Sequence, residues 1–171
     1  MPESPRAPAA VPYPDPMPDP LIPDPESFAP LPEHRRRTWA KFGAWDREYF
    51  PSLVGVQVEE LRTDYCRLRL PFRPALEQPA GAVHGGAIAT LIDTVVVPAI
   101  GAGFDEIPLM LTLSMSINYL GAIRGEDAIA HGWIVRRGRS VTFCEAAVVS
   151  AGGAPAATGS LVYSVRPAPP R

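Results

Sequence analysis

The least polar long stretch of the chain runs from Gly85 to Phe104, and Asp93 is the only ionisable side chain within it. A helix that is apolar on every side is either buried in a protein core or spans a membrane. Asp93 and Pro98 both oppose a membrane span, because a carboxylate near the bilayer centre costs about 2.5–3.5 kcal/mol on insertion scales. We therefore expect a buried central helix with a sheet wrapped around it, and no membrane partner.

Alternation of apolar and polar side chains precedes and follows this stretch, and it predicts half-buried antiparallel strands. Residues 54–58 and 65–72 alternate before it. The clearest alternation covers residues 109–119, whose apolar face we expect to be Leu109, Leu111, Leu113, Met115, Ile117 and Tyr119. The rest of the sheet is expected from three segments joined by Gly-containing turns, at 128–136, 140–150 and 156–165. A long antiparallel sheet with one buried helix is an α+β architecture.

The first 32 residues form a separate compositional segment, with 12 of the 22 prolines and a recurring Pro-Asp-Pro. Such a chain favours extended polyproline II structure and forms no hydrogen-bonded ladder. We expect residues 1–32 to be a tail, disordered or draped over the domain, rather than a docking motif. Residues 33–171 would form a single domain. Its first element would be a helix over residues 33–50, ended by Pro51, with aromatic side chains near helical spacing at Trp39, Phe42, Tyr49 and Phe50.

Composition narrows the functional classes. The formal net charge of −2 and the pI near 5.9 give no electrostatic reason to expect a nucleic-acid partner. Two cysteines are too few for a disulfide scaffold and show no metal-ligand spacing, so we expect reduced thiols and a cytoplasmic protein. The start Met1-Pro2-Glu3-Ser4-Pro5 has neither the basic residues nor the apolar run of a signal peptide, so none is expected. The sequence also lacks a phosphate-binding loop, a nucleophile elbow and a metal-ligand cluster, so neither a cofactor nor a metal is expected.

Asp93 and the start of the apolar helix are the candidates for chemistry. A carboxylate in an apolar helix is costly unless a partner compensates for its burial or a reaction uses it. An ion pair with Arg124 or Arg139 is the structural alternative. At His84-Gly85-Gly86, the first-turn N–H groups have no intrahelical acceptor and favour negative charge. The Gly85 N–H would there stabilise an acyl oxyanion.

Asp93 follows His84 by nine residues, which separates the two by about 13 Å along a helix axis. One chain therefore does not easily bring Asp93 and the Gly85 N–H to the same bond. Two antiparallel copies of the helix, related by a two-fold axis, would do so twice. The sequence thus favours a homodimer whose active sites are shared between two chains.

A known family shows the same arrangement of residues. Gln78, Gly81, His84-Gly85-Gly86 and Asp93 together resemble the core motif of the hotdog-fold acyl-CoA thioesterases of the phenylacetate-pathway (PaaI-like) type. The resemblance extends over about residues 54–165, although that family usually has Asn where this chain has Gln78. It implies a hotdog fold, an acyl-CoA substrate, and a homodimer or a pair of such dimers.

The resemblance also implies catalytic roles. The Gly85 N–H would bind the thioester carbonyl, and Asp93 of the partner chain would act as general base on water or as nucleophile. Gln78 would orient water or substrate, His84 would hold the loop near the carbonyl, and Thr112 would position the water or assist near the thioester. A hydroxyl on the outer face of a strand is otherwise simply solvated, and that alternative for Thr112 stays open.

Substrate contacts follow from the same resemblance. Gly86 would contact the substrate, and the phosphates of coenzyme A would lie near the hairpin that carries Arg137, Gly138 and Arg139, since Arg binds phosphate bidentately. A solubilising turn is the alternative for this hairpin. The helix over residues 33–50 would lie near the acyl pocket, with Trp39, Phe42 and Trp45 shaping the choice of acyl chain.

Two rival functions share the expected fold. One is a hotdog protein that only binds acyl-CoA, as a sensor or an assembly module, and the other is a hotdog dehydratase acting on hydroxyacyl thioesters. A pure binder needs no carboxylate at Asp93, and the dehydratases usually pair an Asp and a His differently. We therefore expect hydrolysis of an acyl-CoA to the free acid and coenzyme A.

Overall fold

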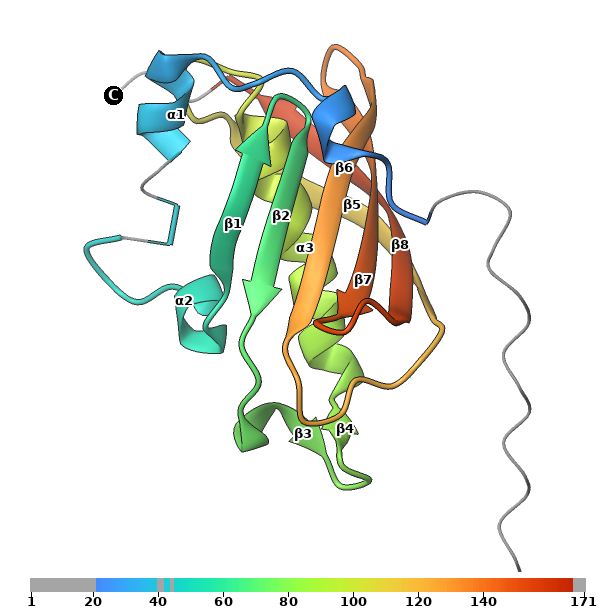
Figure 1. The fold of residues 1–171 in the computed structure, drawn as a ribbon. Coiled ribbons are helices and arrows are strands. Elements are labelled where there is room, and N and C mark those ends of the chain that lie inside the picture. The colour runs from blue at the N-terminus through green and yellow to red at the C-terminus, as the bar shows by residue number, and fades with distance from the viewer. Residues whose placement is uncertain (1–20, 40–41, 44, 168–171) are drawn as a thin grey trace, which may run out of the picture.

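The apolar stretch after His84 forms one long helix, α3 (Gly85–Gly101), at the centre of the protein. The computed structural model describes residues 21–39, 42, 43 and 45–167. Figure 1 shows α3 crossing behind the strands of the sheet. In this described part of the chain, no helix is long and apolar enough to cross a membrane. The sequence correctly predicts that α3 is buried through apolar side chains, among them Ile88, Leu91, Ile92, Val95, Val96, Ala99 and Ile100.

Six antiparallel strands form the main sheet in the order β1–β2–β6–β7–β8–β5. Their bounds are β1 Gln57–Arg62, β2 Tyr65–Leu70, β5 Leu109–Tyr119, β6 Ala128–Arg137, β7 Val141–Ser150 and β8 Pro155–Arg166. A short 3-10 turn, η2 (Pro74–Leu76), leads into a small pair of strands before α3, β3 (Glu77–Gln78) and β4 (Ala82–Val83). This antiparallel sheet around one central helix confirms the predicted α+β hotdog fold.

Two glycines on the inner face of the sheet allow α3 to lie close to it. A Cβ built on Gly132 in β6 would lie 2.7 Å from the side chain of Val95, and one built on Gly159 in β8 would lie 2.6 Å from that of Ile92. Protein interiors are already close-packed, so a side chain at either position would push the helix away from the sheet.

Strand β5 departs from the predicted single apolar face. Its register with β8 shifts between Thr112 and Ser114, and this β-bulge changes which side chains face α3. Before the bulge Thr112 pairs with the buried Tyr163, whereas after it Met115 pairs with the buried Leu161. Because paired residues share a face, the prediction was wrong for the first half of the strand, where Thr112 lies on the face toward α3 and the exposed apolar side chains are Leu109, Leu111 and Leu113.

The predicted helix over residues 33–50 begins at Glu33 as expected, but its continuation to residue 50 is wrong. Instead, α1 (Glu33–Trp39) and α2 (Phe50–Val54) are separate short helices. Gly43 between them has a φ of 90°, which an α-helix does not accommodate. Pro51 lies in the first turn of α2 rather than ending a helix, because its missing N–H has no intrahelical acceptor there. The first strand consequently begins later than predicted.

Part of the Pro-rich segment lies against the turn between β1 and β2. A 3-10 turn, η1 (Pro25–Ser27), is followed by Ala29, whose main-chain oxygen accepts a hydrogen bond from the Thr63 N–H at 2.9 Å. The ring of Phe28 stacks on that of Tyr65 with 5.1 Å between centroids. Residues 24–30 are therefore draped over the sheet, whereas residues 1–20 of the predicted tail lie outside the described residues.

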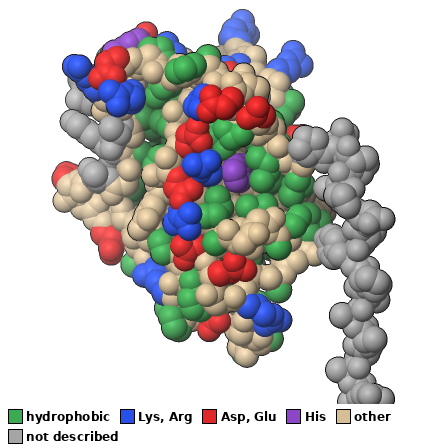
Figure 2. All heavy atoms as spheres, viewed as in Figure 1, with side chains coloured by type: hydrophobic (Ala, Val, Ile, Leu, Met, Phe, Trp, Pro, Cys, Tyr) green, Lys and Arg blue, Asp and Glu red, His purple; other side chains and the backbone are tan. Residues whose placement is uncertain are grey.

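The face formed by β1, β2 and β6 carries a column of alternating acidic and basic side chains, which Figure 2 shows. Arg67 lies 3.0 Å from Glu59, and Arg69 lies 2.9 Å from Asp127. Arg62 is paired in the same way with Glu60 and Glu26. The arginines of this column are thus neutralised by neighbouring carboxylates.

Candidate active site

Asp93 lies in the middle of α3, and its carboxylate is bound from two neighbouring strands. Its Oδ1 accepts a hydrogen bond from the Thr112 hydroxyl at 3.0 Å and another from the Tyr163 hydroxyl at 2.5 Å. No group of the described residues donates to Oδ2. One oxygen of the carboxylate is therefore fixed, and the other stays open to a ligand.

The structural alternative for Asp93 was an ion pair with Arg124 or Arg139, and the described residues show no such pair. Arg124 donates instead to the main-chain oxygens of Ala80 and Gly81, at 2.7 and 3.0 Å. Asp93 is thus held by two neutral hydroxyl groups rather than by a cation.

Thr112 was predicted for the site, whereas Tyr163 was not. The bulge in β5 turns Thr112 toward Asp93, and although the residue is exposed, its hydroxyl is hydrogen-bonded to the carboxylate rather than only to solvent. Tyr163 carried a signal in the sequence: it alternates with Leu161 and Val165 along the buried face of β8, and a buried tyrosine hydroxyl needs a partner. Burial and the hydrogen bond to Asp93 raise the pKa of Tyr163 well above its usual range, so its hydroxyl stays a proton donor.

A cavity of about 450 Å³ opens beside Asp93. Thr94, Val97 and Pro51 complete a wall made largely of aromatic rings, from Phe42, Trp45, Tyr49 and Phe50. The sequence predicted Phe42 and Trp45 for the acyl pocket, and both line this cavity. Trp39 does not line it, because its indole is buried against Gly101 of α3.

The start of α3 carries one N–H group without an acceptor. His84 caps the helix, and its Nδ1 accepts a hydrogen bond from the Gly86 N–H at 2.9 Å. The main-chain oxygen of His84 accepts from the N–H groups of Ala87 and Ile88. Among the described residues, nothing accepts from the Gly85 N–H. Gly85 is therefore the donor that this helix end can offer to a carbonyl oxygen, whereas the Gly86 N–H is already used.

A second cavity, of about 520 Å³, surrounds this helix end. Gln78, His84, Gly85 and Tyr119 all line it. Gln78 Oε1 accepts a hydrogen bond from the Ala80 N–H at 3.0 Å, which leaves its amide nitrogen for a ligand. The Tyr119 hydroxyl, which the sequence did not single out, donates to the Gly85 main-chain oxygen at 2.9 Å.

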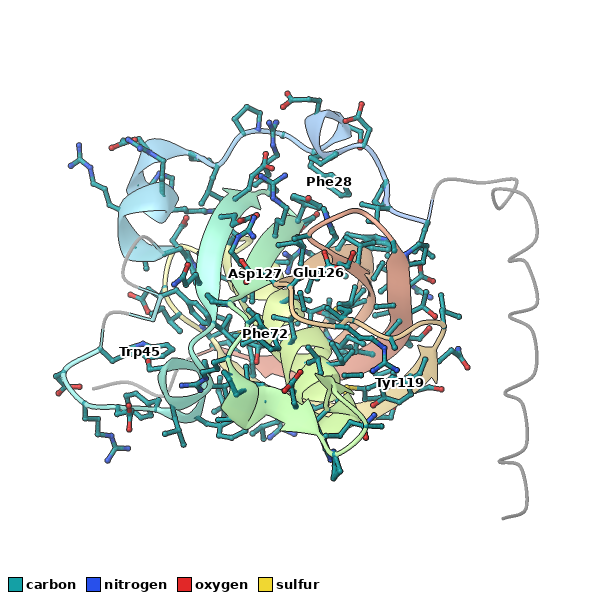
Figure 3. All side chains as sticks on the ribbon, turned by 60° about the horizontal axis from the view of Figure 1, so that its bottom comes forward. Phe28, Trp45, Phe72, Tyr119, Glu126 and Asp127 are labelled. Atoms are coloured by element: carbon teal, nitrogen blue, oxygen red, sulfur yellow. The ribbon has the colours of Figure 1, made fainter. Side chains whose placement is uncertain are left out.

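The two cavities share no lining residue, although one helix borders both. The eight residues from Gly85 to Asp93 correspond to about 12 Å along the helix axis. Figure 3 shows Trp45, from the Asp93 cavity, and Tyr119, from the Gly85 cavity, on opposite sides of the molecule. A single chain thus does not bring the carboxylate and the oxyanion donor together.

The hairpin predicted to meet coenzyme A lies near the other end of α3. Arg137 binds the Asp64 carboxylate through Nε at 2.7 Å and the Ala99 main-chain oxygen at 3.0 Å, so it links α3 to the turn between β1 and β2. Gly138 donates to the Val141 main-chain oxygen at 2.8 Å within the hairpin. Phosphate binding here stays a prediction, and the exposed Arg139 suits it better than Arg137.

Other chemistries find little support in the described residues. No group of three or more His, Cys, Asp or Glu in this part of the chain could hold a metal ion. Cys66 and Cys144 are buried free thiols, and burial raises the pKa of Cys144 to about 12. A thiol that stays protonated is a poor nucleophile.

Comparison with known proteins decides the family. A family model described as the thioesterase superfamily matches residues 80–157. Over 105 residues the chain is 36% identical to "Putative esterase VNG_1336C" of Halobacterium salinarum, a match that covers 58% of this chain and 68% of the relative. The chain belongs to the thioesterase superfamily.

Solved structures agree with this thioesterase fold. The conserved protein PA5202 of Pseudomonas aeruginosa is 27% identical, with a TM-score of 0.65, and the match covers 70% of this thioesterase and 94% of PA5202. The PaaI protein of E. coli, from the phenylacetic acid degradation operon, is 13% identical with a TM-score of 0.69 over 77% of this chain and 94% of PaaI. The second likeness shows the fold alone. Family membership indicates a function of the thioester hydrolase type.

Proposed function

We propose that this thioesterase hydrolyses acyl-CoA to the free acid and coenzyme A, at two sites formed between the chains of a homodimer. The observation that carries the proposal is the separation of Asp93 from the Gly85 N–H, which border different cavities of one chain. An attacking group and an oxyanion donor must meet at one carbonyl. Each site would therefore take these two groups from different chains.

Strand β5 offers an edge through which a second copy could bind. It stands at the end of the sheet order, paired with β8 on one side only. Its 11 residues include Leu111 and Leu113, which are 58% and 59% exposed. A long apolar edge strand is a template for pairing with another strand. Antiparallel pairing of two β5 strands about a two-fold axis would continue the sheet and bring two antiparallel α3 helices side by side.

The proposed chemistry follows from the two groups. The thioester oxygen accepts from the Gly85 N–H, and this hydrogen bond strengthens as the oxygen becomes anionic. Asp93 of the other chain either removes a proton from the attacking water or attacks the carbonyl carbon itself, forming an anhydride that water then opens. In both routes one water is consumed, the carbon–sulfur bond breaks and coenzyme A leaves as the thiol.

The aromatic cavity beside Asp93 is the proposed place for the acyl group. Its volume of about 450 Å³ falls in the range of about 300–1,000 Å³ that is usual for small-molecule pockets. Gln78 and His84 border the other cavity, so they would contact the thioester from the side of the Gly85 N–H.

The test is release of free thiol from short, medium, long and aromatic acyl-CoAs by the wild type and by Asp93→Asn. We expect wild-type release, and loss of most turnover in Asp93→Asn while acyl-CoA still binds. Asp105→Asn is the matched control, because Asp105 is an exposed carboxylate paired with His34 and Arg35. Full activity of Asp93→Asn would refute its catalytic role. Tight binding without release from any member of the panel would favour the acyl-CoA-binding function instead.

A further inference from the structure

Tyr163 is a buried residue whose hydroxyl, among the described residues, contacts Asp93 and Thr112. It projects from β8 toward α3, and only 2% of its surface is exposed. Its hydroxyl lies 2.5 Å from Asp93 Oδ1 and 2.8 Å from the Asp93 main-chain oxygen. A phenol in a protein core contributes large apolar area, but its hydroxyl must find a partner. Here that partner is the carboxylate to which the reaction is assigned.

A second hydroxyl reaches the same carboxylate oxygen from the neighbouring strand. Thr112 of β5 is the register partner of Tyr163 in β8, and its Oγ1 donates to Asp93 Oδ1 at 3.0 Å. Hydrogen bonds to an ionised acceptor are stronger than those between neutral groups. With both donors on Oδ1, the carboxylate plane cannot turn without breaking at least one of them.

The geometry points to Tyr163 as a positioning residue, which holds Asp93 so that Oδ2 is presented to the aromatic cavity. This inference rests on the proposed function, because it takes Asp93 as the reacting carboxylate. Oδ2 receives no hydrogen bond from the described residues, and Asp93 borders the cavity. Fixing one oxygen would keep the other within reach of the water or the carbonyl carbon, and misplacement of a reacting group by about 1 Å can cost about 100-fold in rate.

The test must distinguish the orientation of Asp93 by Tyr163 from a purely structural role of Tyr163. The contact of the Tyr163 hydroxyl with the Asp93 main-chain oxygen would also tie β8 to α3. Loss of such a tie would lower stability, whereas loss of carboxylate orientation would lower kcat in a protein that is still folded. Loss of carboxylate orientation would also leave KM nearly unchanged, because Tyr163 does not line the cavity in which the substrate is proposed to bind.

The variant is Tyr163→Phe, which keeps the ring and removes the hydroxyl. Tyr65→Phe is the matched control: Tyr65 is equally buried, and its hydroxyl lies 2.8 Å from Nδ1 of His131, away from the site. We expect Tyr163→Phe to lower kcat by about 10- to 100-fold, with KM within about two-fold of the wild type. Tyr65→Phe should keep the wild-type kcat, and both variants should lose a similar amount of stability in thermal unfolding.

Thr112 gives a second measurement with a conservative rescue. Thr112→Val removes the other donor and should lower kcat, whereas Thr112→Ser keeps a hydroxyl and should retain most of it. A kcat of Tyr163→Phe equal to that of the wild type, or an equal loss in Tyr65→Phe, would overturn the inference while leaving the proposed function intact. Full activity of Asp93→Asn would overturn both the proposed role of Asp93 and the inference on Tyr163, since Tyr163 would then have no reacting group to orient.

Discussion

The indole of Trp39 fills the space beside Gly101 into which any side chain would project. A Cβ on Gly101 would lie 1.8 Å from Cζ2 of Trp39, whose side chain is almost fully buried. The contact joins α1 to the C-terminal end of α3. Ring contacts then lead from Trp39 through Phe42 to Trp45, so the same contact anchors the segment that lines the Asp93 cavity.

Gly101→Ala should displace this indole and lower the free energy of unfolding by about 1–3 kcal/mol, the usual cost of overpacking. Urea denaturation measures the change. The control is the same substitution in a Trp39→Ala background, where the space is empty and the added methyl should cost much less. Equal costs in the two backgrounds would show that the indole does not occupy this space.

The Gly85 N–H can be removed with little disturbance to α3. Gly85→Pro deletes the donor at the first position of the helix, where proline is favoured, and the preceding His84 already has the extended ψ of 136° that a following proline requires. We expect kcat to fall about 100- to 1,000-fold, as when an oxyanion donor is lost. Gly85→Ala retains the N–H and should keep most of the activity in the same thiol-release assay. Similar losses in both variants would mean that space, rather than the N–H, is what matters at Gly85.

Trp45 tests whether the aromatic cavity selects the acyl group. Trp45→Ala enlarges the cavity and removes a ring that a bound acyl chain would contact, so kcat/KM should fall for aromatic and medium-chain acyl-CoAs more than for acetyl-CoA. Phe143→Ala is the control, because Phe143 is an exposed ring of β7 that does not border this cavity. An unchanged order of substrates in Trp45→Ala would place the acyl group elsewhere.

His131 should make the stability of the fold depend on pH. Burial lowers the pKa of His131 to about 4 from 6.5. The unfolded chain therefore binds more protons between these values, and the free energy of unfolding should fall as the pH drops from about 6.5 toward 4, by at most about 3 kcal/mol.

Urea midpoints measured from pH 7 to pH 4 test this dependence. His131→Gln should flatten the decline, because glutamine does not titrate there. His34→Gln, at an exposed histidine, should keep the wild-type decline. If the urea midpoint of His131→Gln falls with pH as steeply as that of the wild type, the pH dependence of stability comes from other titratable groups.

Periodicity was enough to predict α3 and most strands, because each packs one continuous apolar surface against a neighbour. It failed in β5, where no Gly or Pro marks the bulge. Only the pairing with β8 fixes the register there and turns Thr112 toward Asp93. It also failed over residues 33–50, because the aromatic spacing there reflects a chain of ring contacts in a loop, with centroids 5.2–6.0 Å apart, rather than one face of a helix.

The candidate site was predictable where its residues are close in sequence. Gln78, His84, Gly85 and Asp93 form one continuous motif around a helix start, so their chemistry and spacing are visible in the sequence. Tyr163 lies 70 residues from Asp93, and nothing local links the two. Their contact depends on the order of strands in the sheet.

In the proposed dimer, each active site takes Asp93 from one chain and the Gly85 N–H from the other. Mixing Asp93→Asn with Gly85→Pro after unfolding and refolding them together tests it directly. A mixed dimer would then hold one site with both defects and one site with neither, because the first chain supplies an intact Gly85 and the second an intact Asp93.

Thiol release should therefore reappear in an equimolar mixture of the two inactive variants, at about one quarter of the wild-type rate if chains pair at random. Each variant refolded alone should stay inactive, and sedimentation should show a dimer at the assay concentration. If mixed dimers form and the mixture is as inactive as its components, the shared site is contradicted. A site formed entirely within one chain would keep that chain's own substitution, whichever chain it pairs with, and would stay inactive.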